Sequence, residues 1–272
     1  MPDINNLIDH VFGPFRLTIT PELVTNYVRA TGDDTQRWTE VAPPGLFSAA
    51  FFQAAPEFFE HPEVADLAHS VIHVDQHCKW FHPTPIGAHW SVTGKVTAVR
   101  QRSRLFFVSF AVDIADAMGE PLVESTATLL MTDGPAPSGA TAERVEPRWH
   151  HKRTNHTPPF REVPILKSAS REDLIGYAAA TNDFNPIHWD HDAARNAGLP
   201  GIVVHGLLGS AWLLQALGDG EAAEARFRYR SAVLPNTQAE IGVVMGGGGV
   251  HKLTLNVGDE AAVTADILTG GS

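Results

Sequence analysis

The chain of 272 residues contains one cysteine, Cys78. A single thiol cannot close an internal disulfide, so the sequence gives no sign of an oxidising compartment. No apolar run approaches the length needed to cross a bilayer, and the N-terminal residues lack the basic and apolar regions of a signal peptide. We therefore expect a cytoplasmic protein without a membrane partner.

Basic charge is also scarce. Lysine and arginine number 20 against 31 aspartate and glutamate residues, which gives a formal net charge of −11. Phosphate backbones are bound by basic surfaces, so this balance argues against nucleic acid as a partner. What is present is a 43% hydrophobic composition, enough for a buried core, in a chain with room for two domains or one large one.

The segment around residue 185 combines a carboxylate, an amide and an imidazole. Asn185 precedes Pro186, and a residue before proline is pushed out of the helical region, so a helix ending near Thr181 must break into a turn. The Asn185 side chain can hold such a turn. We therefore expect Asp183 and His188 to lie on a loop that aims both side chains into one pocket.

A glycine opens the next apolar segment. Gly206 precedes the run 207–217, which has helical length. Backbone N–H groups at a helix N-terminus have no intrahelical partner and favour negative charge. The Gly206 N–H is therefore a candidate donor to a negatively charged group.

These residues carry a family resemblance. The pattern Asp-Phe-Asn-Pro-Ile-His, followed downstream by His-Gly, resembles the (R)-specific enoyl-CoA hydratase and MaoC-like dehydratase family of hotdog-fold proteins. The resemblance covers residues 172–217 directly. It implies that Asp183 and His188 act on a water, that Asn185 supports them, and that the Gly206 N–H polarises a thioester carbonyl. It also implies an acyl-CoA or acyl carrier protein thioester as substrate.

The chain contains an internal repeat. Residues 20–33 align with residues 170–183 at a constant offset of 150. Both copies open with a helix N-cap, and two related halves are the simplest explanation. The matched pairs are Glu22 and Glu172, Tyr27 and Tyr177, Ala30 and Ala180, Thr31 and Thr181, and Asp33 and Asp183.

The first copy lacks the chemical groups of the second. Its residues at the three motif positions are Thr35, Trp38 and Ala50, in place of Asn185, His188 and Gly206. Tryptophan cannot act as a base, because its indole N–H is only a donor. Asp33 remains, and we interpret it as structural. The repeat therefore predicts one active site per chain, in the second half, with the first half as scaffold or part of the acyl pocket.

The predicted fold class is α+β, a double hotdog in which each half is a long helix against a curved antiparallel sheet. We expect a degenerate N-terminal domain at 1–132, a Gly- and Pro-rich linker at 133–158 and a catalytic domain at 159–272. Alternating and turn-bounded segments predict the strands. These are 90–99, 105–114, 122–131, 225–233, 239–245, 250–257 and 261–268, with further helices at 46–55 and 207–217.

Two arginine triplets could meet the phosphates of CoA or dock an acidic carrier protein. The alternative is that both lie on solvated strand faces. The triplets are Arg226, Arg228 and Arg230, which we take as candidate substrate-binding residues, and Arg100, Arg102 and Arg104. A monomer and a homodimer are both consistent with a duplicated chain.

Three groups of histidines invite comparison with metal sites. None has the ligand number and spacing of a recognised zinc site, so we predict no metal and no cofactor. The Gly246–Gly249 turn also lacks the Lys and Ser/Thr of a phosphate loop. The groups are His188 with Asp190 and His191, His150 with His151 and His156, and His73 and His77 on either side of Asp75.

The predicted reaction is reversible hydration of a 2-enoyl thioester to a 3-hydroxyacyl thioester, with (R) stereochemistry implied by the resemblance. Two alternatives remain open at this level: a hotdog acyl-CoA thioesterase and a non-catalytic acyl-thioester-binding protein. The sequence does not choose the acyl chain, the carrier or the physiological direction.

Overall fold

The computed structural model describes residues 3–68, 70–132, 164–218 and 222–270. Within them, no helix is long and apolar enough to cross a membrane. The predicted linker at 133–158 lies outside the described residues, as do His150, His151 and His156. The division into domains at 1–132 and 159–272 stays a prediction.

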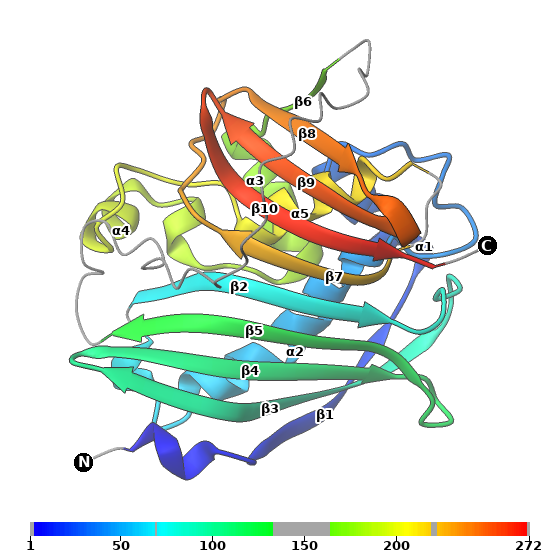
Figure 1. The fold of residues 1–272 in the computed structure, drawn as a ribbon. Coiled ribbons are helices and arrows are strands. Elements are labelled where there is room, and N and C mark those ends of the chain that lie inside the picture. The colour runs from blue at the N-terminus through cyan, green and yellow to red at the C-terminus, as the bar shows by residue number, and fades with distance from the viewer. Residues whose placement is uncertain (1–2, 69, 133–163, 219–221, 271–272) are drawn as a thin grey trace.

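The described residues form one antiparallel sheet of ten strands, in the order β1-β3-β4-β5-β2-β7-β10-β9-β8-β6 (Figure 1). The strands are β1 (Val11–Thr18), β2 (Ser70–Trp80), β3 (His89–Arg102), β4 (Leu105–Ala115), β5 (Pro121–Thr132), β6 (Ile165–Lys167), β7 (Ala222–Tyr229), β8 (Ala239–Met245), β9 (Val250–Val257) and β10 (Glu260–Thr269).

The strand order repeats between the two halves. Within the first half the strands follow the order first, third, fourth, fifth, second, and the second half follows the same order from the opposite edge. The second strand of each half therefore lies at the centre, where β2 pairs with β7 from Asp75 opposite Arg228 to Lys79 opposite Glu224. This agreement supports the duplication that the sequence predicts.

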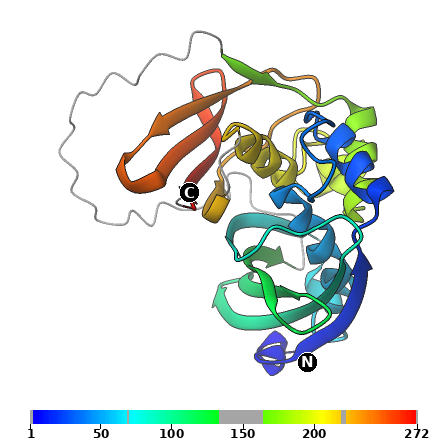
Figure 2. The ribbon, with the colours of Figure 1, turned by 90° about the vertical axis from the view of Figure 1, so that its right-hand side faces the viewer.

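In the described ranges, five α-helices accompany the sheet: α1 (Pro21–Ala30), α2 (Phe47–Glu60), α3 (Arg171–Thr181), α4 (His191–Asn196) and α5 (Gly206–Gln215). Helix α2 packs on β1, β3 and β4, and α5 packs on β7, β9 and β10. Figure 2 shows the curved first-half sheet around α2. Each half thus has the expected helix against an antiparallel sheet.

Aromatic burial holds the first half together. The ring of Phe58 on α2 stacks on Phe110 of β4 with centroids 4.8 Å apart, and Phe51 meets the same ring edge-on at 5.8 Å. Each fully buried phenyl group stabilises the fold by roughly 1.5–3 kcal/mol. Helices α1 and α3 pack against each other, and their repeat-related Tyr27 and Tyr177 rings lie 6.0 Å apart. The repeat sequences thus meet at the junction of the halves.

Helix α3 begins as the sequence predicts. Ser170 and Asp173 form a reciprocal capping box. The strands β1, β2 and β6 were not predicted, and β7 ends at Tyr229, short of the expected residue 233. Helix α2 continues to Glu60 although Pro56 lies inside it.

Candidate functional site

A residue in the left-handed backbone conformation turns the chain toward the site. Helix α3 ends at Thr181, and Asn182 follows with φ of 65°. Residues Pro186–His188 then form a single 3-10 turn, in which the Asn185 side chain accepts a hydrogen bond from the Ile187 N–H at 3.4 Å. The predicted break after Thr181 is therefore confirmed, and the Asn185 side chain holds the turn as expected, while its support of Asp183 and His188 in a reaction stays a prediction.

His188 is buried and has a defined tautomer. Its Nδ1 lies 2.8 Å from the Val203 carbonyl oxygen. Because a carbonyl only accepts, Nδ1 carries the proton and Nε2 of the neutral ring has a free lone pair. Burial lowers the pKa of His188 to about 4, partly offset by the bond to Val203. The ring is therefore neutral at physiological pH and can accept a proton at Nε2.

Asp183 is also buried, with 6% of its surface exposed. Burial raises the pKa of its carboxyl to about 7, opposed by a hydrogen bond from the Asn185 N–H. Both the acid and the carboxylate are consequently accessible near neutral pH, which suits a group that exchanges protons.

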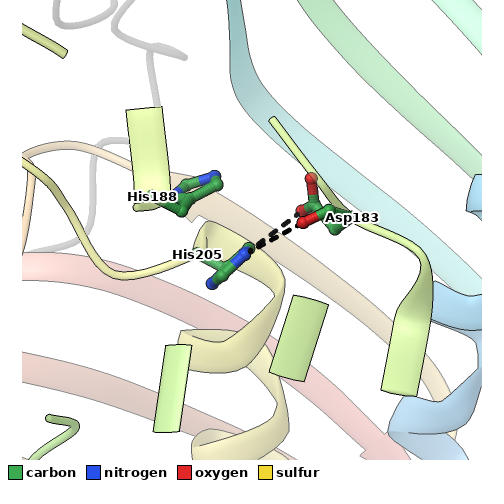
Figure 3. Close-up of side chains that lie close together, drawn as sticks. All are labelled: Asp183, His188 and His205. Atoms are coloured by element: carbon green, nitrogen blue, oxygen red, sulfur yellow. Dashed lines mark hydrogen bonds and ion pairs between the residues drawn. The ribbon is translucent and has the colours of Figure 1, made fainter. Parts of the chain in front are cut away.

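His205 completes the cluster (Figure 3). Its ring stacks on His188 with centroids 3.7 Å apart, and its Nε2 lies 3.4 Å from the Asp183 carbonyl oxygen and 4.0 Å from Oδ2. Burial, followed by the neighbouring His188, lowers the pKa of His205 well below its usual value. Sequence reasoning did not assign His205 a role, although its position directly before Gly206 at a helix start was a usable signal.

The three side chains also have the composition of a metal site. Asp183, His188 and His205 each offer a donor atom within 4.8 Å of the others. However, a metal ion binds an imidazole nitrogen in the plane of the ring, and the His188 and His205 rings stack with an interplanar angle of 25° and centroids 3.7 Å apart, so their lone pairs lie in two separate, nearly parallel planes. This arrangement does not fit a single ion, and it fits proton transfer better.

Gly206 is the first residue of α5, where N–H groups lack an intrahelical acceptor. A Cβ at this position would lie 3.1 Å from the Tyr229 ring, closer than side chains normally pack. The Tyr229 hydroxyl is 2.8 Å from Ser210 Oγ on the same helix. Tyr229 therefore closes against the glycine and holds the helix start in place.

His73 extends this contact into the first half. The β2–β5 register shifts between His73 and Asp75, which places His73 on the inner face with Gln76. The Gln76 amide donates to the His77 carbonyl, so its oxygen faces His73 and accepts from Nε2 at 2.9 Å. The His73 ring then meets Tyr229 at 5.0 Å.

The same register shift separates His73 from Asp75 and His77, the group on β2 for which the sequence spacing predicts no metal site. Asp75 and His77 lie on the outer face, where Asp75 accepts from Thr128 and His77 bonds Glu224 at 2.7 Å. Because β-bulges re-aim side chains, a strict alternation in the sequence could not have placed His73 at the site.

The candidate substrate-binding arginines are not brought to the cluster. Alternate residues of β7 are buried inward, including Phe227, so Arg226 and Arg228 project from the opposite face of the sheet. Arg228 lies 3.9 Å from Asp266, and Arg230 follows the end of the strand. In the other triplet, Arg100 covers the ring of Phe107 at 4.8 Å.

The first-half counterpart of the site has a different set of contacts. Asp33 accepts from Trp38 Nε1 at 2.7 Å and pairs with Arg37 at 3.4 Å, in agreement with a structural role. The predicted match of Ala50 to Gly206 is wrong, because the two residues occupy different positions in their helices. Helix α2 begins at Phe47 after the turn Pro44–Leu46, so Ala50 is its fourth residue.

Comparison with known proteins adds the following. The MaoC-like domain family matches residues 150–265. A mitochondrial 3-hydroxyacyl-[acyl-carrier-protein] dehydratase of Arabidopsis thaliana is 45% identical over 52 residues, 19% of this chain and 30% of that protein. The 3-hydroxyacyl-thioester dehydratase X of Mycobacterium tuberculosis is 24% identical over 242 residues, 86% of this chain and 79% of that protein.

Solved structures show the fold. HtdX of Mycobacterium tuberculosis superposes with a TM-score of 0.73 at 20% identity, covering 94% of this chain and 97% of that one. A second protein of that organism, described as having a double hotdog fold, superposes with a TM-score of 0.60 at 11% identity, covering 99% of this chain and 98% of that one. The predicted α+β double hotdog is therefore confirmed.

Proposed function

Because the second half of the chain belongs to the MaoC-like domain family, we propose that this protein is a hydro-lyase that adds water reversibly to a 2-enoyl thioester. The hydro-lyase class rests on the family and on the 3-hydroxyacyl dehydratase relatives. The observation that carries the proposal is the buried cluster of Asp183, His188 and His205 beside the N-terminus of α5.

Two groups carry out the proton transfers of the reaction: Asp183, whose pKa is raised, and His188, whose pKa is lowered. A water between Asp183 and His188 gives a proton to His188 Nε2 as its oxygen bonds to C3 of the substrate. The electrons of the C2–C3 double bond move toward the thioester oxygen, and the protonated Asp183 supplies the proton that C2 receives. Groups whose environments push their pKa values apart are suited to such complementary roles.

The backbone N–H of Gly206 stabilises the developing oxyanion. Negative charge on the thioester oxygen accepts a hydrogen bond from the Gly206 N–H at the start of α5. A donor of this kind contributes about 3 kcal/mol to the transition state. His205 acts through its neighbours, because its ring packs on His188 and its Nε2–H faces the Asp183 carbonyl.

The finer assignments are also part of the proposal. The carrier is CoA or an acyl carrier protein, the product has (R) configuration at C3, and the chain works in the cytoplasm as a monomer or homodimer. The likeness to dehydratases named for an acyl carrier protein and for a thioester supports the class of substrate. The single cysteine supports the compartment.

The direct test is a hydration assay over short, long, branched and dicarboxylic 2-enoyl-CoAs, with chiral analysis of the product. We expect enoyl absorbance to fall without release of free thiol, and the product to be the (R)-3-hydroxyacyl-CoA. Thiol release at the rate of substrate loss would instead identify a thioesterase. Tight binding of every enoyl-CoA without turnover would identify a non-catalytic binding protein.

A further inference from the structure

A cavity of about 400 Å³ lies at the other end of the central strand pair. It shares no residue with the cluster of Asp183, His188 and His205. This volume is within the range of sites that hold small molecules. Prolines and small residues make up much of its wall, together with a group of aromatic side chains: Trp38, Phe47, Trp80, Phe81, His82 and Trp90.

The duplication identifies what the cavity corresponds to. Trp38 follows Asp33 by five residues, as His188 follows Asp183. Trp80 ends β2 and lines the cavity, as Tyr229 ends β7 and packs on Gly206. The cavity is therefore the first-half counterpart of the catalytic site.

The N-termini of α2 and α5 give the third correspondence between the two halves. Phe47, the first residue of α2, lines the cavity, as Gly206 begins α5 beside the catalytic cluster. The Trp80 indole N–H donates to the Pro44 carbonyl at 3.1 Å, which fixes the second-strand side chain against the helix start. The same three elements thus enclose a site in each half.

The first-half site has a cavity but lacks the proton-transfer groups of the second half. Both oxygens of Asp33 are engaged, by the Asp34 N–H at 2.8 Å and by Trp38 Nε1 at 2.7 Å. The indole ring of Trp38 provides no basic nitrogen. Its bond to Asp33 instead holds the ring as a fixed apolar wall.

We propose that this cavity is a second, non-catalytic binding site for the acyl chain of an acyl-CoA. The proposal rests on the proposed function of the second half, because the correspondence transfers its substrate class to the first. The indole and phenyl rings of the wall offer apolar surface against which an alkyl chain is withdrawn from water. The Lys79 ammonium, 4.6 Å from the Phe81 ring centroid, places a cation beside this wall for the anionic head group.

The test counts binding sites on the full chain with decanoyl-CoA, which has no double bond to hydrate, by isothermal titration calorimetry. Ala223→Trp and Val41→Trp each fill the cavity from a different wall. We expect both variants to bind one decanoyl-CoA fewer per chain than the wild type. The matched control is His188→Trp, which fills the catalytic site instead. Decanoyl-CoA should still bind to the first-half site of this variant.

Far-ultraviolet circular dichroism establishes that each variant is folded, and two independent variants keep the test decisive if one is not. An equal count in wild type and both folded variants would overturn the proposal. Decanoate and free CoA are titrated separately. If decanoate binds the wild type and either variant abolishes that binding, the cavity is an acyl site that also accepts a free fatty acid. If free CoA alone binds in the cavity, the assignment to the acyl chain is overturned. Failure of enoyl hydration would reject the proposed function without changing this difference in count.

Discussion

Single residues at the site owe their chemistry to burial. Asp183 and His188 are both withdrawn from water, and burial favours the neutral form of each, so their pKa values move in opposite directions. The hydrogen bond from His188 Nδ1–H to Val203 then decides which ring nitrogen can act. These two facts support the complementary acid and base roles that we propose for the pair.

The pH profile of kcat/KM for hydration should be bell-shaped. Activity requires neutral His188 and protonated Asp183, so it rises as His188 loses its proton near pH 4 and falls as Asp183 ionises near pH 7. Initial rates at subsaturating enoyl-CoA across this range give the profile. Activity that continues to rise above pH 8 would contradict the assignment.

Asp183→Asn should become more stabilising, relative to wild type, as the pH rises. The folded-state pKa of Asp183 is about 7, above its unfolded value of 3.8. Its contribution to wild-type stability is thus full below the unfolded pKa and is lost as pH rises through the folded pKa, by roughly 1 kcal/mol per pH unit between these values. Urea unfolding of both proteins at pH 5, 6, 7 and 8 measures the difference, and a constant difference would refute the buried-carboxyl account.

At the scale of elements, β2 brings the first half to the site. The register shift near Val74 turns His73 inward, where Gln76 fixes its tautomer and its ring supports Tyr229 against Gly206. A helix start on one half is in this way held by a strand of the other.

His73→Ala should therefore lower kcat while leaving KM nearly unchanged. An edge-to-face aromatic contact contributes about 0.5–1.5 kcal/mol, which corresponds to a loss of about 2- to 12-fold. His73→Phe retains the ring and should recover most of kcat, and His77→Ala on the outer face is the matched control. Equal kcat for His73→Ala and wild type would exclude this positioning role.

The sequence predicts elements where local rules decide them. The N-cap of α3 and the break before Pro186 follow from Ser170 and Asn185, and both occur as expected. Strand β2 escaped detection because its bulge interrupts the alternation of side chains, and β6 because it has only three residues. The place of His205 and the outward projection of Arg226 depend on the packing of distant segments, which local pattern does not contain.

Across the whole molecule, the duplication explains both the symmetry and its breakdown. Two halves with one strand order meet at β2 and β7, and the repeat-related tyrosines pack between α1 and α3. From sequence alone, the offset of 150 residues predicts two related halves, but not how they meet. Only the second half retains an imidazole at the motif position, because Trp38 occupies that place in the first.

We propose that one site per chain, built on His188, performs hydration. The most direct measurement is kcat/KM for hydration of 2-butenoyl-CoA by His188→Ala, beside His191→Ala on the exposed start of α4 as control. Loss of a general base lowers the rate by about 10²–10⁴-fold, and we predict a loss in this range for His188→Ala with little change in the control. Hydration by His188→Ala within a fewfold of wild type would show that this imidazole is not the general base.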